Sequence, residues 1–191
     1  MNNLDSPSDS LRNQFLIAMP GLQDPNFART VTLICEHNED GAMGIIINRV
    51  LDLPISNVLV QLDVSEYRSE LDEHLVHLGG PVQESSGFVI HAPLGDWEAD
   101  LQIDVDLGVS ASREILRKIA KGEGPEQWLL ALGYAGWGPG QLEQEIGQNS
   151  WLNGPVNREI LFNLPIEERW HAAAEHLGVN LAQISGDAGH A

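Results

Sequence analysis

The strongest signal for the fold lies in Leu132-Gly133-Tyr134-Ala135-Gly136-Trp137-Gly138-Pro139-Gly140-Gln141-Leu142-Glu143. An apolar run, a glycine-dense segment and a polar amphipathic run follow one another here without a break. Glycine allows positive φ and close backbone approach that a Cβ would prevent. The order therefore predicts a strand over Trp128–Tyr134, a tight corner, and a helix over Gln141–Gln148.

This glycine corner also admits a second interpretation. Helix N-termini that follow glycine-rich segments bind anions through free amides and the helix dipole. However, the stretch contains no Lys, Arg, Ser or Thr, and Glu143 and Glu145 place negative charge in the first helical turns. The Walker and dinucleotide spacings are both absent. A structural corner is favoured, with a phosphate site as the alternative.

The clearest neighbouring pattern is a hairpin. Residues Arg29–His37 alternate between apolar and polar, Asn38–Gly41 has turn chemistry, and Ala42–Asn48 resumes an apolar run. Two such runs separated by a short turn predict an antiparallel hairpin. Further short strands are expected at Phe15–Met19, Leu75–Leu78 and Gly87–His91, and a strand with one wet face at Leu101–Leu107.

Helical periodicity marks the remaining elements. Pro54–Leu62 has apolar residues at helical spacing, and Ser110 or Ser112 can cap a helix that runs to about Lys121. Two helices broken at Pro165 are expected between Pro155 and about Gly178. Strands and helices do not alternate strictly, so we expect an α+β fold with a mixed or antiparallel sheet. Residues 1–13 are predicted to be a disordered tail, and residues 14–191 a single domain.

Composition limits the possible functions. The chain has 191 residues, 28 acidic and 10 basic side chains, and a formal net charge of -18. Because DNA binding depends on Lys and Arg displacing counterions, direct nucleic-acid binding is disfavoured. One cysteine cannot form an internal disulfide and no charged-then-apolar leader is present, so a cytoplasmic location is expected. The apolar runs are too short for a membrane span.

Cys35-Glu36-His37-Asn38 suggests a nucleophile or a metal site. Zinc needs three or four ligands, and no second Cys or His spacing completes the set. A lone cysteine in an apolar strand is usually a core residue. His37 and Asn38 are interpreted as residues that shape the turn, with ligand contact as the alternative.

Two carboxylates and one arginine raise further alternatives. Asp104 and Asp106 lie one strand period apart, which suits a hard cation but is equally typical of a solvated sheet face. Arg49, beside Asn48, is either a paired structural charge or an anchor for an anionic ligand. We predict no metal and no cofactor.

Known catalytic signatures are absent, including GxSxG, the Walker loop, SxxK and HExxH. The sequence therefore favours a protein without enzymatic activity, and no catalytic residue is assigned. The candidate ligand-binding residues are those at the hairpin end and in the glycine corner: Glu36, His37, Asn38, Asn48, Arg49, Tyr134, Gly136, Trp137, Gly138 and Gly140.

Several separated motifs resemble the bacterial AlgH/YqgE family. They are Phe15-Leu16-Ile17-Ala18-Met19-Pro20, Ile34-Cys35-Glu36-His37-Asn38, Gly41-Ala42-Met43-Gly44-Ile45-Ile46-Ile47-Asn48, Gly79-Gly80-Pro81-Val82, the glycine corner, Asn149-Ser150-Trp151-Leu152 and Gly189-His190-Ala191. The resemblance implies one α+β domain with a bifurcated sheet surrounded by helices. It also implies a label as a transcriptional regulator linked to alginate production, which describes an effect on a pathway and supplies no mechanism.

Two departures from the family pattern are visible. Ser86-Gly87-Phe88 stands where the family usually has Arg-Gly-Phe, which removes an arginine that an anion site could use. Ser110-Ala111-Ser112-Arg113-Glu114 replaces Thr-Thr-Ser-Arg-Asp, and Ala111 lacks a capping hydroxyl, so helix entry must depend on a neighbouring serine.

The leading hypothesis is a cytoplasmic protein that influences gene expression indirectly, through a protein partner or a small ligand near the glycine corner and the hairpin end. The alternative is a nucleotide-binding or small-anion-binding protein, or an enzyme, that uses the Gly136–Gly140 turn.

Overall fold

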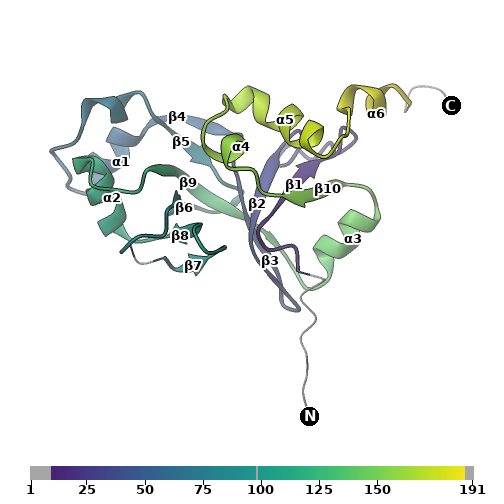
Figure 1. Cartoon of the computed structure of the whole chain (residues 1–191), viewed down its shortest axis with the longest axis horizontal. Coiled ribbons are helices and arrows are strands. Elements are labelled where there is room, and N and C mark those ends of the chain that lie inside the picture. Colours follow the sequence, from purple (N-terminus) through teal and green to yellow (C-terminus); the bar gives the residue numbers. More distant parts are fainter. Residues whose placement is uncertain (1–9, 98, 188–191) are drawn as a thin grey trace, which may run out of the picture.

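The computed structural model describes residues 10–97 and 99–187, which form one α+β unit built on a ten-stranded sheet. The strands are β1 (Gln14–Ala18), β2 (Val31–Asn38), β3 (Gly41–Ile46), β4 (Val50–Pro54), β5 (Leu75–Leu78), β6 (Val82–Ala92), β7 (Leu101–Gln102), β8 (Gly108–Ser110), β9 (Gln127–Trp137) and β10 (Trp151–Pro155). The helices are α1 (Ile55–Gln61), η1 (Ser69–Asp72), α2 (Arg113–Lys121), α3 (Gln141–Gly147), α4 (Arg158–Phe162), η2 (Ile166–Glu168), α5 (Arg169–His176) and α6 (Leu181–Asp187). In Figure 1, α1 and α2 lie at one end of the molecule, α3 and α6 lie toward the other, and α4 and α5 lie between them.

The sheet is mixed and it forks at β9. Its main path runs β10-β1-β2-β3-β9-β6-β8-β7, while β4 and β5 form a branch in which β5 is parallel to β9. Ala131 and Leu132 of β9 pair with β5, whereas residues Ala135 to Trp137 pair with β3. The neighbour of β9 on one side therefore changes between Leu132 and Ala135, and this change divides the sheet.

Glycine permits this fork. Gly133 has φ +74°, and a Cβ built there would lie 2.4 Å from the carbonyl oxygen of Gly80. The amide of Gly79 donates to the Leu132 oxygen at 2.8 Å, and the Gly79 oxygen accepts from Ile46 at 2.8 Å. The backbones thus approach without intervening side chains. The predicted end of this strand at Tyr134 was wrong, because β9 continues to Trp137 and the turn occupies only Gly138–Gly140.

Three apolar clusters cover the sheet. Side chains of β1 alternate between its faces, as strand geometry requires, so that Phe15 and Ile17 pack under α4, α5 and α6 while Leu16 packs with α3. A separate cluster joins α1 and α2 to the strands β5, β6 and β9. The hairpin end and the glycine turn both lie beside α3 (Figure 1).

Most local predictions agree with the structure. The β2–β3 hairpin is antiparallel and confirmed, and the helices α1, α2 and α3 lie where they were expected. Helix α2 is capped by Ser112, whose hydroxyl accepts from the Glu114 amide at 3.1 Å. The chain breaks at Pro165 between α4 and the η2–α5 segment, as predicted.

The predicted strand over Leu101–Leu107 was wrong. Only Leu101–Gln102 is a strand, because the Asp104 carboxylate accepts from the amides of Asp106 and Leu107, both at 2.7 Å, and closes a turn. Strands β4, β8 and β10 and helices η1 and α6 were not predicted. Of the predicted tail 1–13, residues 1–9 lie outside the described residues, as does the Gly189-His190-Ala191 motif, whereas the Leu11 amide donates to His37 Nδ1 at 2.9 Å.

Candidate functional site

Half of the predicted site residues meet in one surface hollow. Glu36, Asn38, Tyr134, Gly136 and Trp137 line a hollow of about 680 Å³ at the hairpin end. They come together because β3 pairs with β9 in the register that places Ala42 opposite Trp137 and Met43 opposite Gly136. Sequence reasoning missed the remaining lining residues, Asp40, Gly41, Ala42, Met43 and Val82, because this register is a long-range property.

The hollow combines negative charge with apolar surface. Glu36 and Asp40 are exposed acids, and none of the ten lining residues is Lys or Arg. Met43 and Tyr134 are partly buried, and the Tyr134 ring meets Phe88 edge to face at 6.0 Å. This surface suits a cationic group with an apolar neighbour and would repel a phosphate.

His37 is engaged in structural contacts beside the hollow. Its side chain is 4% exposed, and its Nε2 lies 2.6 Å from Glu143 Oε1. Because the Leu11 amide donates to Nδ1, the ring proton is on Nε2 and is donated to Glu143. The pKa of Glu143 is lowered by a hydrogen bond from its own backbone amide and then by the bond from His37. His37 thus ties α3 and the N-terminal segment to β2.

The contacts of the glycine turn weigh against an anion site. Gly140 is the N-cap of α3 with φ 73°, and the Gly138 amide donates to Gln141 Oε1 at 3.0 Å. The Glu145 carboxylate accepts from the indole nitrogens of Trp137 at 2.8 Å and Trp151 at 3.0 Å. An anion at this turn would therefore meet a capped amide and a nearby carboxylate.

Asn48 and Arg49 follow the other end of β3, away from the hollow. The Arg49 guanidinium donates to the carbonyl oxygens of Pro25, Asn26 and Ala28 at 2.7 to 2.9 Å. Asn48 accepts from the Val31 amide at 2.8 Å and donates to the Arg29 carbonyl oxygen at 2.9 Å. Both side chains fold the loop before β2 onto the sheet. The structure does not bring them together with the hairpin-end residues.

Cys35 lies in the core. It is 1% exposed, and burial raises the pKa of its thiol to about 12. A thiol that is both inaccessible and protonated is a poor nucleophile. The structure therefore supports the interpretation of Cys35 as a core residue.

The Asp104 carboxylate is also used internally. Besides closing its turn, it lies 3.3 Å from Arg158 Nη2. Within residues 10–97 and 99–187, no three His, Cys, Asp or Glu side chains gather in a way that could hold a metal ion.

The structure contains a buried serine–histidine pair that was not predicted from the sequence. His91 Nε2 lies 2.9 Å from Ser110 Oγ, and its Nδ1 lies 3.1 Å from the Pro93 oxygen. Burial lowers the pKa of His91. Both side chains are 0% exposed, so a substrate cannot reach the hydroxyl. No local sequence signal marks this pair, because pairing of β6 with β8 brings the two residues together.

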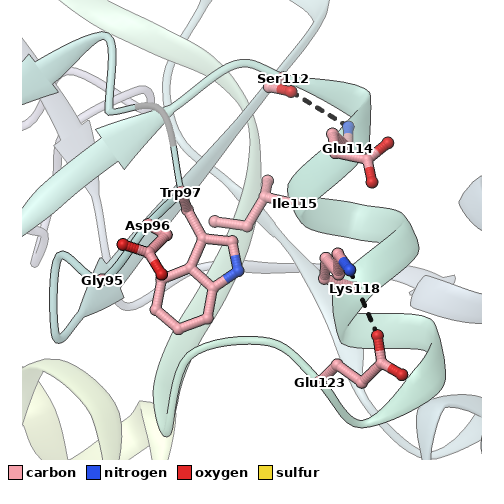
Figure 2. A pocket seen from close by; sticks show the side chains of 8 residues that line it. All are labelled: Gly95, Asp96, Trp97, Ser112, Glu114, Ile115, Lys118 and Glu123. Carbon is pink, nitrogen blue, oxygen red and sulfur yellow. Dashed lines mark hydrogen bonds and ion pairs between the residues drawn. The ribbon is translucent and has the colours of Figure 1, made fainter.

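Figure 2 shows another cavity, of about 650 Å³, between α2 and the loop that carries Trp97. The indole of Trp97 and the side chain of Ile115 face it. Lys118 is the only basic residue among its described lining residues, and it lies 3.4 Å from Glu123 (Figure 2). None of the predicted site residues lines this cavity.

The sequence model of AlgH-like proteins matches residues 15–182. The chain belongs to the AlgH-like family. A UPF0301 protein from Nitrosococcus oceani is 54% identical over 180 residues, covering 94% of this chain and 96% of that protein. Another from Thioalkalivibrio sulfidiphilus is 54% identical over 184 residues, covering 96% and 98%.

Two solved structures share the AlgH-like fold. The solution structure of AlgH from Pseudomonas aeruginosa matches with a TM-score of 0.78 and 47% identity, over 100% of both chains. An X-ray structure of a protein from Corynebacterium diphtheriae matches with a TM-score of 0.72 and 22% identity, over 93% of both chains, which shows the fold alone. The α+β class, predicted from the order of strands and helices, is thus confirmed, as is the forked sheet that the family resemblance implied. None of the helices in the described part of the chain is long and apolar enough to cross a membrane.

Proposed function

We propose that this AlgH-like protein influences gene expression from the cytoplasm by binding a partner protein at the hairpin-end hollow, without contacting DNA itself. The hollow's chemistry carries the proposal: Glu36 and Asp40 stand beside Met43, Val82 and Tyr134, with no basic side chain among the lining residues. Charge complementarity then selects a partner segment with Lys or Arg next to an apolar side chain.

The family resemblance and the net charge support the regulatory part of this proposal. A chain with 28 acidic and 10 basic residues repels a DNA backbone, so a regulator of this composition acts through a protein. The nucleotide-binding alternative has less support, because the amide of Gly138 is occupied by Gln141 and the hollow lacks a cation.

Site-specific photocrosslinking in living cells tests the binding site. A benzophenone amino acid at Met43 should give an adduct with a specific protein, whereas the same group at Val60, which is 59% exposed on α1, should not. Glu36→Lys with Asp40→Lys should abolish the adduct. The control pair Glu66→Lys with Glu175→Lys makes the same charge change at exposed positions that do not line the hollow and should preserve it.

The regulatory role needs a separate readout. In a strain that lacks the gene, the wild-type chain and the control pair should restore the transcript profile, and the hollow variant should not. An adduct that still forms in the Glu36→Lys, Asp40→Lys variant would overturn the proposed site. ATP titration that shifts only the Tyr134–Glu143 amides in NMR spectra would favour the nucleotide-binding alternative instead.

A further inference from the structure

A second cavity, of about 870 Å³, lies between the β4–β5 branch, the start of β9 and the α4–η2 segment. Its lining includes Asn48, His77, Trp128 and Arg169, and it shares no described lining residue with the hairpin-end hollow. Its occupant is therefore independent of the partner proposed above.

Arg169 is a buried cation without a counter-ion. Its residue is 5% exposed, yet no carboxylate in the described part of the chain lies within ion-pair distance of it. Its Nε donates to the Leu164 oxygen at 3.0 Å and its Nη1 to the Ile47 oxygen at 2.6 Å. Its Nη2 makes no hydrogen bond to any described residue. Buried charges are normally paired, because losing hydration costs several kcal/mol.

His77 does not supply the missing charge. Its Nε2 lies 3.4 Å from Arg169 Nη1, and the pKa of His77 is lowered to about 3, by burial first and then by the charge of Arg169. The ring is therefore neutral at physiological pH. The pKa of Arg169 is lowered by burial to about 10, so the guanidinium remains cationic. The wall of the cavity thus holds one uncompensated positive charge.

The rest of the cavity indicates what kind of anion fits. Val50 and Leu75, each 38% exposed, line it together with the partly buried Trp128. Large exposed aliphatic side chains and an aromatic ring offer contact to an apolar body. The exposed lining residues Glu73, Glu126 and Glu167 add negative charge, which opposes a dianion more strongly than a monoanion.

We propose that this cavity binds a small monocarboxylate with an aromatic or aliphatic body. The carboxylate pairs with Arg169 at Nη2, and the body packs against Trp128, Val50 and Leu75. The alternative is a purely structural arginine that holds the end of β3 and the segment after α4 together through the Ile47 and Leu164 carbonyls.

Three probes separate these roles in ¹⁵N-labelled full-length protein at pH 7 and low ionic strength. Benzoate should shift the Trp128 indole resonance and the Val50 and Leu75 amides saturably, with a Kd on the order of 1 mM for so small a ligand. Benzamide has the same shape without charge and should bind roughly tenfold more weakly. Inorganic phosphate should leave these resonances unmoved. Equal binding of benzoate and benzamide, or no saturable shift with benzoate, overturns the proposal.

Variants test the charge assignment. Arg169→Gln should abolish benzoate binding, whereas Arg117→Gln, at an exposed arginine 3.7 Å from Glu114, removes the same charge elsewhere and should not. Because Arg169→Gln also removes structural hydrogen bonds, a second variant leaves the arginine in place. Glu126→Gln with Glu167→Gln should tighten benzoate binding about twofold to threefold by reducing repulsion. Unchanged or weaker affinity in this pair would contradict a monoanion site on Arg169.

Discussion

Among single residues, the buried polar groups of this molecule find their hydrogen-bond partners far away in the sequence. Arg169 begins α5, but its guanidinium reaches the Ile47 oxygen that follows β3 and the His77 ring of β5. Arg169 donates to the neutral His77 ring, and this contact partly satisfies the hydrogen-bonding requirement of both side chains.

The stability of the protein should fall as the pH is lowered from about 6.5 to about 3. The unfolded chain binds a proton at His77 below its ordinary pKa of 6.5, whereas the folded chain binds it only near pH 3. Acid therefore favours the unfolded state, by up to about 1.4 kcal/mol per pH unit from this group alone. Urea unfolding at several pH values gives the free energy of unfolding as a function of pH. Its slope between pH 6.5 and pH 3 should be shallower for His77→Gln than for the wild type, whatever the stabilities of the two proteins at pH 8. Parallel profiles would show that His77 titrates normally.

At the scale of elements, the fork in β9 explains the glycine-dense stretch. A strand that changes its neighbour from β5 to β3 requires the backbones of Gly79–Gly80 and Gly133 to touch. In the surface turn at Gly138–Gly140, Gly140 needs glycine only for its positive φ, because no neighbouring atom would contact a Cβ there. Two glycines with almost the same φ therefore face different surroundings.

Gly133→Ala should destabilise the protein far more than Gly140→Ala. Both positions have φ near +74°, which costs alanine about 1 kcal/mol. At Gly140 a Cβ meets nothing within 4 Å, whereas at Gly133 it would lie 2.4 Å from a backbone oxygen that no rotamer can move. We expect a loss of about 3 kcal/mol or more at Gly133. Chemical denaturation of both variants measures the difference, and equal losses would mean that the fork tolerates a side chain.

At the scale of the whole molecule, the net charge of -18 is the dominant electrostatic property. The described ion pairs are few and mostly exposed, so they neutralise little of the repulsion among the carboxylates. Such a molecule gains stability when salt screens its charges, and it avoids other polyanions.

Raising the NaCl concentration from about 20 to 200 mM should increase the Tm by about 2 to 4 °C, because screening of self-repulsion worth about 1 kcal/mol has that effect in a chain of this size. Duplex DNA should show no retardation in gel-shift experiments over the same range of salt. Salt-sensitive retardation at nanomolar protein would contradict the indirect mode of regulation and point to a basic surface formed by assembly.

Local sequence determined the β2–β3 hairpin, the helices α1, α2 and α3, the Ser112 cap and the acidic character of the chain. These features depend on periodicity and on hydrogen bonds between residues a few positions apart. The same local reasoning failed at Leu101–Leu107, although apolar and polar residues alternate there. The Asp104 side chain accepts hydrogen bonds from two backbone amides and forms a turn in place of a strand.

Tertiary contacts alone fix where the sheet forks, which residues line the hairpin-end hollow and which charge is buried. Asp40 and Met43 join Tyr134 through pairing between strands about 90 residues apart, and Arg169 meets His77 across 92 positions. No local pattern encodes such contacts, because they depend on which backbones can approach and on which polar groups lose water when the sheet closes. The site chemistry of this AlgH-like protein is therefore a product of its topology.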